Sequence, residues 1–132
     1  LQSGAIQFCQ IDATRLGGVN DVLAVILMAA KYGILICPHG GGIGLCNMIL
    51  HYALWDQVCV AGHSEGQVVE YLNFLQQDVF LVPVTIKSGA YLIPSQPGWG
   101  LEMHEDFMIR HTYPSGEVWQ GREASGSITF LA

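Results

Sequence analysis

The chain has 132 residues, of which 51% are hydrophobic and only 12% charged, with a formal net charge of −6. Its five lysine and arginine residues are scattered singly, so no basic patch indicates a nucleic-acid partner. No apolar run reaches the roughly 18 residues of a membrane span, and the start lacks the basic segment of a signal peptide. These features argue against nucleic-acid-binding and membrane proteins. The charged share, about half the usual value, indicates a piece of something larger or extensive buried contacts.

Predicted strands and helices alternate in the first part of the chain. Nearly continuous apolar runs predict strands at 5–11, 34–38 and 58–62. Helical patterns lie at 21–32, 45–55 and 65–77, with Asn20 as the first N-cap and Gly33 as the glycine after the first helix. Short connections between such elements predict a parallel sheet with right-handed crossovers. We therefore expect consecutive βα units of a larger α/β fold.

The character of the sequence changes after about Asp78. Extended and turn-rich stretches follow, and then a polar segment with scattered aromatic residues. We divide the chain into residues 1–78, which carry the βα units, and residues 79–132, an extension that wraps over another part of the molecule. We expect the end after Trp119 to be frayed.

Four cysteines, Cys9, Cys37, Cys46 and Cys59, lie mostly among apolar residues. No CxxC pair is present, so disulfide bonds and a zinc ribbon are both disfavoured. This usage is typical of a reducing compartment. We expect the cytoplasm, with mitochondria as an alternative.

Polar side chains follow each predicted strand, where parallel α/β folds place their functional groups. Asp12 follows the first strand and His39 the second, 27 residues later, the length of one strand–helix–strand repeat. Asp12 could accept a hydrogen bond from one ring nitrogen of His39, leaving the other as a general acid or base. Glycines after His39 would leave room for a ligand. A buried histidine bonded to a structural aspartate fits the same spacing.

Two other interpretations of this loop are weaker. Gly42 and Gly44 begin a GxGxxG match, but Asn47 occupies the third position and no lysine follows. A helix N-terminus here could still hold an anion such as a carboxylate. A metal site would have to combine Cys37, His39, Cys46 and His51, whose spacing matches no standard zinc pattern. We expect His51 to be a capping or surface group.

The segment QIDATRLGGVNDVLAVILMAAKYGILICPHGGGIGLC closely resembles the L-fuconate dehydratase group, in the mandelate racemase branch of the enolase superfamily. The likeness continues through VVEYLNFL, AYLIPSQPGWGLEM and YPSGEVW, up to about Trp119. It implies the C-terminal part of a modified TIM barrel, with strands six to eight and their helices. Residues 79–132 would then pack on a capping domain.

The resemblance also implies an activity. Members of this group are Mg²⁺-dependent hydro-lyases that remove the proton alpha to a sugar-acid carboxylate and expel the 3-hydroxyl. The expected reaction converts L-fuconate to 2-keto-3-deoxy-L-fuconate. The expected partner is a small sugar acid, with no nucleic acid and no membrane, and homo-oligomerisation of the parent protein is left open.

Site residues follow from the same resemblance. Asp12 and His39 match the family's dyad, in which the histidine is the general acid/base and here assists departure of the hydroxyl. Glu70 matches a substrate-contacting glutamate, Glu65 is the second choice, and Gly40 and Gly41 line the same loop and would touch the substrate through their backbone.

Some family features are missing from these 132 residues. The metal-binding carboxylates and the lysine pair would lie before Leu1, so we expect the isolated chain to be inactive. Asn47 stands where an acidic residue is expected. The alternatives are a non-catalytic barrel fragment or interaction protein, and another acid-sugar dehydratase or racemase of the superfamily.

Overall fold

The computed structural model describes residues 1–72 and 76–123. It begins with two parallel strands, β1 (Phe8–Cys9) and β2 (Leu35–Ile36), connected by the 3₁₀ turn η1 (Ala13–Arg15) and the helix α1 (Val19–Lys31). Phe8 pairs with Leu35, and Cys9 with Ile36. The first two predicted strands and their parallel pairing are therefore confirmed, although each strand is shorter than expected.

Backbone hydrogen bonds continue beyond the two assigned strands. The amide of Cys37 donates to the carbonyl of Cys9 at 3.0 Å, and the amide of His39 donates to the carbonyl of Ile11 at 2.9 Å. The two chains thus run side by side up to the point where the candidate polar residues begin.

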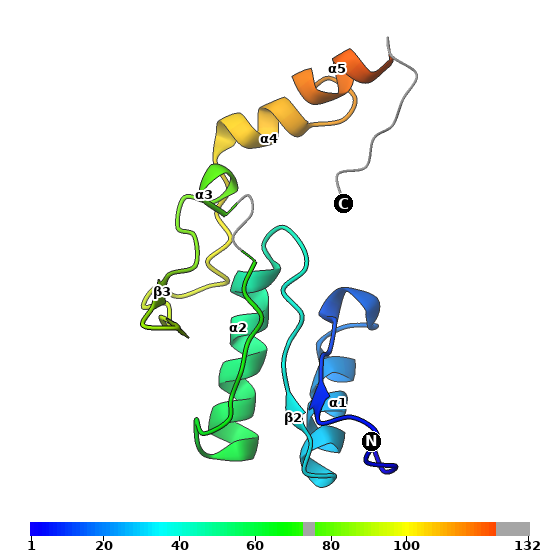
Figure 1. Ribbon diagram of the computed structural model, residues 1–132. Helices are drawn as coiled ribbons and strands as arrows, with labels where there is room; N and C mark the ends of the chain where they lie inside the picture. Colours follow the sequence, from blue (N-terminus) through cyan, green and yellow to red (C-terminus); the bar gives the residue numbers. More distant parts are fainter. Residues whose placement is uncertain (73–75, 124–132) are drawn as a thin grey trace.

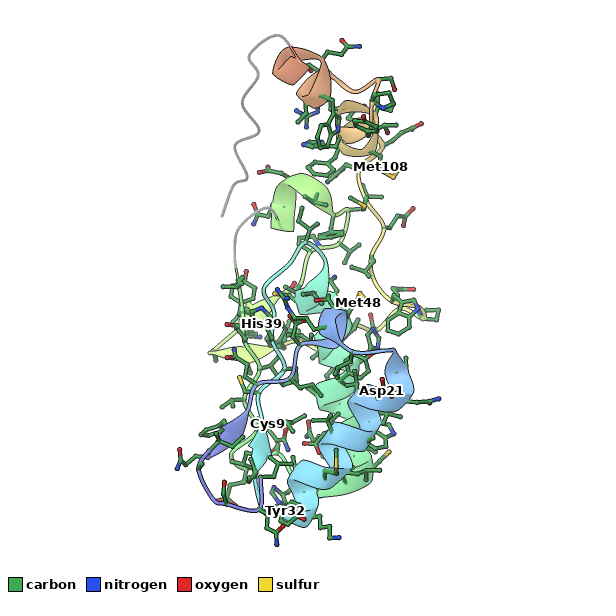
Figure 2. The ribbon with its side chains drawn as sticks, turned by 90° about the vertical axis from the view of Figure 1, so that its right-hand side faces the viewer. Cys9, Asp21, Tyr32, His39, Met48 and Met108 are labelled. Atoms are coloured by element: carbon green, nitrogen blue, oxygen red, sulfur yellow. The ribbon has the colours of Figure 1, made fainter. Side chains whose placement is uncertain are left out.

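Both helices after the strands pack on one side of the strand pair (Figures 1 and 2). The helix α1 buries Val22, Ile26 and Ala29 against Ile36 and against Tyr52 of α2 (Leu45–Trp55). These positions recur at helical spacing, so a single face of α1 enters the core. The expected helix at 45–55 is confirmed with the same bounds.

The expected N-cap of the first helix is wrong. The helix α1 begins at Val19, and its N-cap is Gly18, whose φ of 140° is unfavourable for residues with a Cβ. Asn20 lies in the first turn, and the carboxylate of Asp21 accepts a hydrogen bond from the amide of Gly17 at 3.0 Å. The expected end is confirmed, because Gly33 follows the helix in the left-handed conformation.

The third predicted strand, at 58–62, is also wrong. Residues Asp56–Ala61 continue α2 as a π-helical turn, η2, which ends at Gly62 in the left-handed conformation. The short run Val58, Cys59, Val60 is apolar, but periodicity alone cannot assign so short a run to a strand. Val58 is 74% exposed, so this run is not a buried strand.

The helix predicted at 65–77 is also wrong. Because α2 continues as η2 to Ala61, the elements that follow it begin later in the sequence than predicted. Residues 67–72 are extended and return along α2 (Figure 1), and the helix α3 covers only Gln76–Val79. Part of the predicted helix, residues 73–75, lies outside the described residues.

The remaining segment forms a hairpin and two short helices. Strands β3 (Ile86–Lys87) and β4 (Ala90–Tyr91) pair antiparallel, and they are followed by α4 (Glu105–His111) and α5 (Glu117–Glu123). A second small core joins the side chains of Val79, Phe80 and Phe107. The expected division at residue 78 stays a prediction. The end after Trp119 was expected to be frayed, but residues 120–123 belong to α5, and residues 124–132 lie outside the described residues. Within the described chain, none of the helices has the length and apolar character to cross a bilayer.

Candidate active site

His39 lies just beyond the end of β2, beside the end of β1. The hydrogen bond from its amide to the carbonyl of Ile11 fixes its backbone next to Asp12. Figure 2 shows His39 and Tyr32 toward opposite ends of the strand pair, with Cys9 between them. The expectation that the strands bring Asp12 and His39 to the same edge is therefore confirmed.

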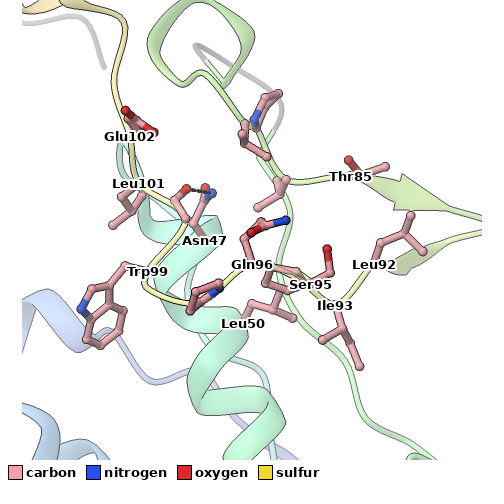
Figure 3. A pocket seen from close by; sticks show the side chains of 16 residues that line it. Asn47, Leu50, Thr85, Leu92, Ile93, Ser95, Gln96, Trp99, Leu101 and Glu102 are labelled. Atoms are coloured by element: carbon pink, nitrogen blue, oxygen red, sulfur yellow. Dashed lines mark hydrogen bonds between the residues drawn. The ribbon is translucent and has the colours of Figure 1, made fainter.

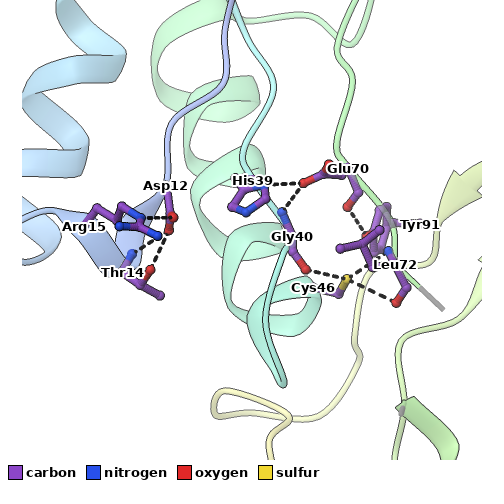
Figure 4. A network of polar contacts seen from close by, with 9 residues as sticks. All are labelled: Asp12, Thr14, Arg15, His39, Gly40, Cys46, Glu70, Leu72 and Tyr91. Carbon is purple, nitrogen blue, oxygen red and sulfur yellow. Dashed lines mark hydrogen bonds and ion pairs between the residues drawn. The ribbon is translucent and has the colours of Figure 1, made fainter. Parts of the chain in front are cut away.

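The partner of the His39 ring is Glu70 (Figure 4). Nδ1 of His39 lies 2.6 Å from Oε2 of Glu70, and the amide of Gly40 donates to the same oxygen at 2.6 Å. The two side chains are 33% and 27% exposed, so the pair is partly shielded from water and partly accessible to it. One carboxylate oxygen thus binds two consecutive residues of the loop.

The predicted hydrogen bond between Asp12 and His39 is not found. Oδ1 of Asp12 accepts from the amide of Thr14 at 2.9 Å and from its hydroxyl at 2.7 Å, and Oδ2 lies 3.4 Å from Nε of Arg15. Asp12 is the N-cap of η1, so these donors are only two or three residues away.

The electrostatics of Asp12 reflect these neighbours. The hydrogen bond from the Thr14 hydroxyl lowers the pKa of Asp12, with smaller contributions from the Thr14 amide and from the charges of His39 and Arg15; partial burial opposes them. Asp12 is therefore an ionised neighbour of His39.

Glu70 is held in place by a contact of its own backbone and by a contact of Leu72, two residues later. The hydroxyl of Tyr91 donates to the carbonyl of Glu70 at 2.6 Å, and the amide of Leu72 donates to Sγ of Cys46 at 3.5 Å. The Cys46 thiol also lies 3.8 Å from the carbonyl oxygen of Gly40. Burial raises the pKa of Tyr91, which keeps its hydroxyl protonated as a donor.

Tyr91 and Cys46 support the site, and neither role was predicted from the sequence. Both act through backbone groups of distant residues, and no spacing rule relates position 91 to position 70. Burial also raises the pKa of Cys37, next to the site, and the nearby charge of Glu70 adds to this effect. Cys37 is therefore a neutral thiol rather than a thiolate.

The two glycines after His39 lie where a side chain would collide. A Cβ at Gly40 would lie 3.0 Å from the carbonyl oxygen of Glu70 and 3.3 Å from Sγ of Cys46. A Cβ at Gly41 would overlap the His39 ring at Nε2 and Cε1. Gly41 therefore borders the ring nitrogen that Glu70 does not bind.

Two other predicted positions lie elsewhere. Glu65 is exposed in the turn that precedes the extended segment, and a Cβ on its neighbour Gly66 would lie 3.2 Å from Leu35, at the start of β2. Since His39 follows the end of β2, the structure does not bring Glu65 to it. His51 is not a surface group either, because its ring is partly buried and packs edge-on against Trp99 at 5.1 Å.

Residues 1–107 match the family model described as enolase C-terminal domain-like. This chain belongs to that family. Mitochondrial enolase superfamily member 1 of Homo sapiens is 45% identical over 120 residues, which cover 91% of this chain and 27% of the relative. L-galactonate dehydratase of Hypocrea jecorina is 46% identical over 121 residues, which cover 90% and 26%. D-galactonate dehydratase of Verminephrobacter eiseniae is 25% identical over 145 residues, 97% and 35%.

A crystal structure supports the same assignment. That of human mitochondrial enolase superfamily member 1 superposes with a TM-score of 0.81 at 44% sequence identity, over 91% of this chain and 27% of that one. The fold prediction, part of the α/β barrel of the enolase superfamily, is thereby confirmed. The chain spans about a quarter of the length of these first relatives.

The described residues of this enolase-superfamily chain offer no set of ligands for the magnesium ion that the resemblance implies. Nowhere in residues 1–72 and 76–123 do three or more His, Cys, Asp or Glu side chains converge as a metal site. The thiol of Cys46, one member of the zinc set considered above, is instead engaged with Gly40 and Leu72.

A cavity of about 610 Å³ lies between α2 and residues 82–85 and 92–102 (Figure 3). Its lining includes Asn47, Trp99 and Glu102 but neither His39 nor Glu70. Asn47, at the position where the resemblance led us to expect an acid, donates to the carbonyl of Gly100 at 2.8 Å. This residue therefore anchors the later segment to α2.

Proposed function

We propose that this chain supplies the histidine-bearing part of the active site of an acid-sugar dehydratase, with His39 as its general acid/base. The observation that carries the proposal is the 2.6 Å contact between Nδ1 of His39 and Glu70, at the end of the two parallel strands. A histidine held at one ring nitrogen, with the other nitrogen beside a glycine, has the geometry of a proton donor or acceptor. The names of two relatives, which describe dehydratases, support this reaction class.

The reaction begins when a base takes the proton alpha to the substrate carboxylate. His39, in its protonated form, then gives a proton to the 3-hydroxyl, which leaves as water when the C3–O bond breaks. The resulting enol rearranges to the 2-keto-3-deoxy acid. Asp12 contributes a fixed negative charge next to His39, and the absence of side chains at Gly40 and Gly41 lets this loop pack closely against Glu70 and the His39 ring.

The substrate proposed here is L-fuconate or L-galactonate. The first follows from the sequence resemblance, and the second from the name of the Hypocrea relative. The two acids share the configuration of their stereocentres and differ only at C6, so one site geometry near C2 and C3 serves both.

We propose that a metal and the alpha-proton base are held by segments of the complete protein other than these 132 residues, and that the isolated chain is consequently inactive. Residues 79–132 would pack on a capping domain. The compartment proposed is the cytoplasm or, as the names of several relatives suggest, the mitochondrion.

The test uses the complete protein that carries these residues, supplied with Mg²⁺ and a panel of sugar acids that includes L-fuconate, L-galactonate and D-galactonate. We expect formation of a 2-keto-3-deoxy acid from at least one of them. His39→Asn should reduce this rate by about 100-fold or more, the range of a positioned general acid or base, without changing Mg²⁺ affinity. Loss of Mg²⁺ binding in His39→Asn, or no dehydration of any acid in the panel, would contradict the proposal.

A further inference from the structure

The hairpin of β3 and β4 reaches the candidate site through one side chain. The hydroxyl of Tyr91, in β4, donates to the carbonyl of Glu70 at 2.6 Å, and the Glu70 carboxylate accepts from the amide of Gly40 at 2.6 Å (Figure 4). We propose that Tyr91 is a positioning residue for dehydration, because it holds Glu70 beside the loop that carries His39. This inference rests on the proposed function and leaves the roles of Asp12 and His39 unchanged.

The segment that carries Glu70 depends on contacts with other elements. Residues 67–72 lie in no helix or strand, so no ladder of backbone hydrogen bonds fixes their main chain. Tyr91 binds the carbonyl of Glu70, and Cys46 of α2 accepts from the amide of Leu72 at 3.5 Å. Removal of the Tyr91 hydroxyl therefore frees the main chain at the residue whose side chain reaches the loop after β2.

The hairpin presents the Tyr91 hydroxyl in a fixed position. Tyr91 pairs with Ile86 on the opposite strand. The two turn residues, Ser88 and Gly89, both have positive φ, at 53° and 76°, as in the type I′ turns that match the twist of a hairpin. The Tyr91 ring also packs edge-on against Tyr71, with the ring centres 5.9 Å apart. Strand pairing and ring packing together hold the hydroxyl against the Glu70 carbonyl.

This contact gives the segment after residue 78 a role in the site itself. Tyr91 touches none of the groups that we assign to proton transfer, and it acts through the main chain of Glu70. A misplacement of about 1 Å far from the reacting atoms can reduce a rate about 100-fold. A hydrogen bond that fixes Glu70 therefore contributes to turnover as well as to folding.

The first test measures the position of Glu70 without any substrate. Hydrogen–deuterium exchange of the complete protein is followed by mass spectrometry in a peptide that contains Gly40, whose amide donates to Glu70. Tyr91→Phe removes the hydroxyl and keeps the ring. We expect this variant and Glu70→Ala to exchange about 2–10-fold faster at this peptide than the wild type, the equivalent of one neutral hydrogen bond.

Tyr113→Phe is the matched control, because Tyr113 is 73% exposed in the connection between α4 and α5. Its exchange at Gly40 should equal that of the wild type. Unchanged exchange at Gly40 in Tyr91→Phe, or the same increase in Tyr113→Phe, would overturn the inference.

A double-mutant cycle separates positioning from a structural role. Tyr91→Phe should lower kcat for the sugar acid about 10-fold, but it should lower kcat no further in the Glu70→Ala background, where no carboxylate is left to position. Its effect on the urea midpoint should be the same in both backgrounds, because the backbone carbonyl at position 70 is retained. Equal losses of kcat in both backgrounds, or no loss in Tyr91→Phe alone, would contradict a positioning role. If the wild type dehydrates no acid sugar, the proposed function fails, and exchange at Gly40 still decides whether Tyr91 holds Glu70.

Discussion

Cys46, in the first turn of α2, binds Leu72 of the extended segment that carries Glu70. The amide of Leu72 donates to Sγ at 3.5 Å, and the thiol lies 3.8 Å from the carbonyl of the same residue. Because Cys46 is fully buried, this contact joins the end of the segment to the helix at a position that water does not reach.

Replacement of Cys46 by alanine should therefore loosen the site as well as the fold. Cys46→Ala removes the sulfur contacts and leaves a small void, so we expect the free energy of unfolding to fall by about 1–2 kcal/mol in urea titrations. Cys59→Ala is the control, because Cys59 is exposed on the π-helical turn and should change stability by less than about 0.5 kcal/mol. Equal effects of the two substitutions would show that the sulfur contacts contribute nothing.

The course of the chain after α2 can be tested at Val58. If residues 58–62 formed a buried strand, a charge at Val58 would be strongly destabilising. Since Val58 is 74% exposed on η2, Val58→Lys should cost less than about 0.5 kcal/mol. Ile49→Ala, at a fully buried position of α2, should lower the free energy of unfolding by about 2–5 kcal/mol. A large loss of stability in Val58→Lys would favour the strand that the sequence pattern predicted.

This region shows why the sequence predicted part of the fold and not the rest. The run from Ile34 to Pro38 is bounded by a glycine and a proline, and α2 ends in the residues its helical pattern predicted, so both elements could be identified locally. The run at Val58 has no such boundary on its N-terminal side, and its conformation is decided by the continuation of α2. That displacement moved Glu70 from a predicted helix to an extended segment.

The site was predictable to a similar extent. The parallel order of the strands was sufficient to place Asp12 and His39 at the same edge, because one βα repeat separates them. The choice of hydrogen-bond partner was not predictable, since it depends on Thr14 lying closer to Asp12 than the imidazole does and on the extended segment reaching Gly40. Such distances follow from tertiary packing, which a single sequence does not specify.

Asp12 should contribute to stability in a pH-dependent way. Its pKa in the folded chain is lowered from 3.8, chiefly by the Thr14 hydroxyl. A depressed pKa stabilises the fold above the unfolded value, and this contribution is lost as the pH falls through the folded value. Thr14→Val should therefore destabilise the protein at neutral pH and have less effect well below 3.8. A destabilisation independent of pH would contradict the role of Thr14. A double-mutant cycle of Asp12→Asn and Thr14→Val is the control, because it isolates the interaction between these two side chains.

A side chain at Gly41 should disturb the site, because a Cβ there would overlap the His39 ring. Gly41→Ala must displace the imidazole, and a displacement of about 1 Å can reduce a rate about 100-fold. We expect that loss in the dehydration rate of the complete protein, together with a changed His39 signal in NMR. Gly62→Ala is the control: Gly62 has a φ of 72° and no atoms near its absent Cβ, so it should lose stability but not the His39 signal. Full activity in Gly41→Ala would contradict this placement of the ring.

The most direct test of His39 separates proton removal at C2 from loss of the 3-hydroxyl. In the complete protein, the His39→Asn variant is incubated with the sugar acid in D₂O, and both deuterium incorporation at C2 and formation of the 2-keto-3-deoxy acid are followed by NMR. If His39 protonates the departing hydroxyl, the variant should still exchange the C2 proton while product formation falls by about 100-fold or more. Product formation at the wild-type rate would contradict the assignment of His39 as general acid, and so would loss of exchange together with dehydration.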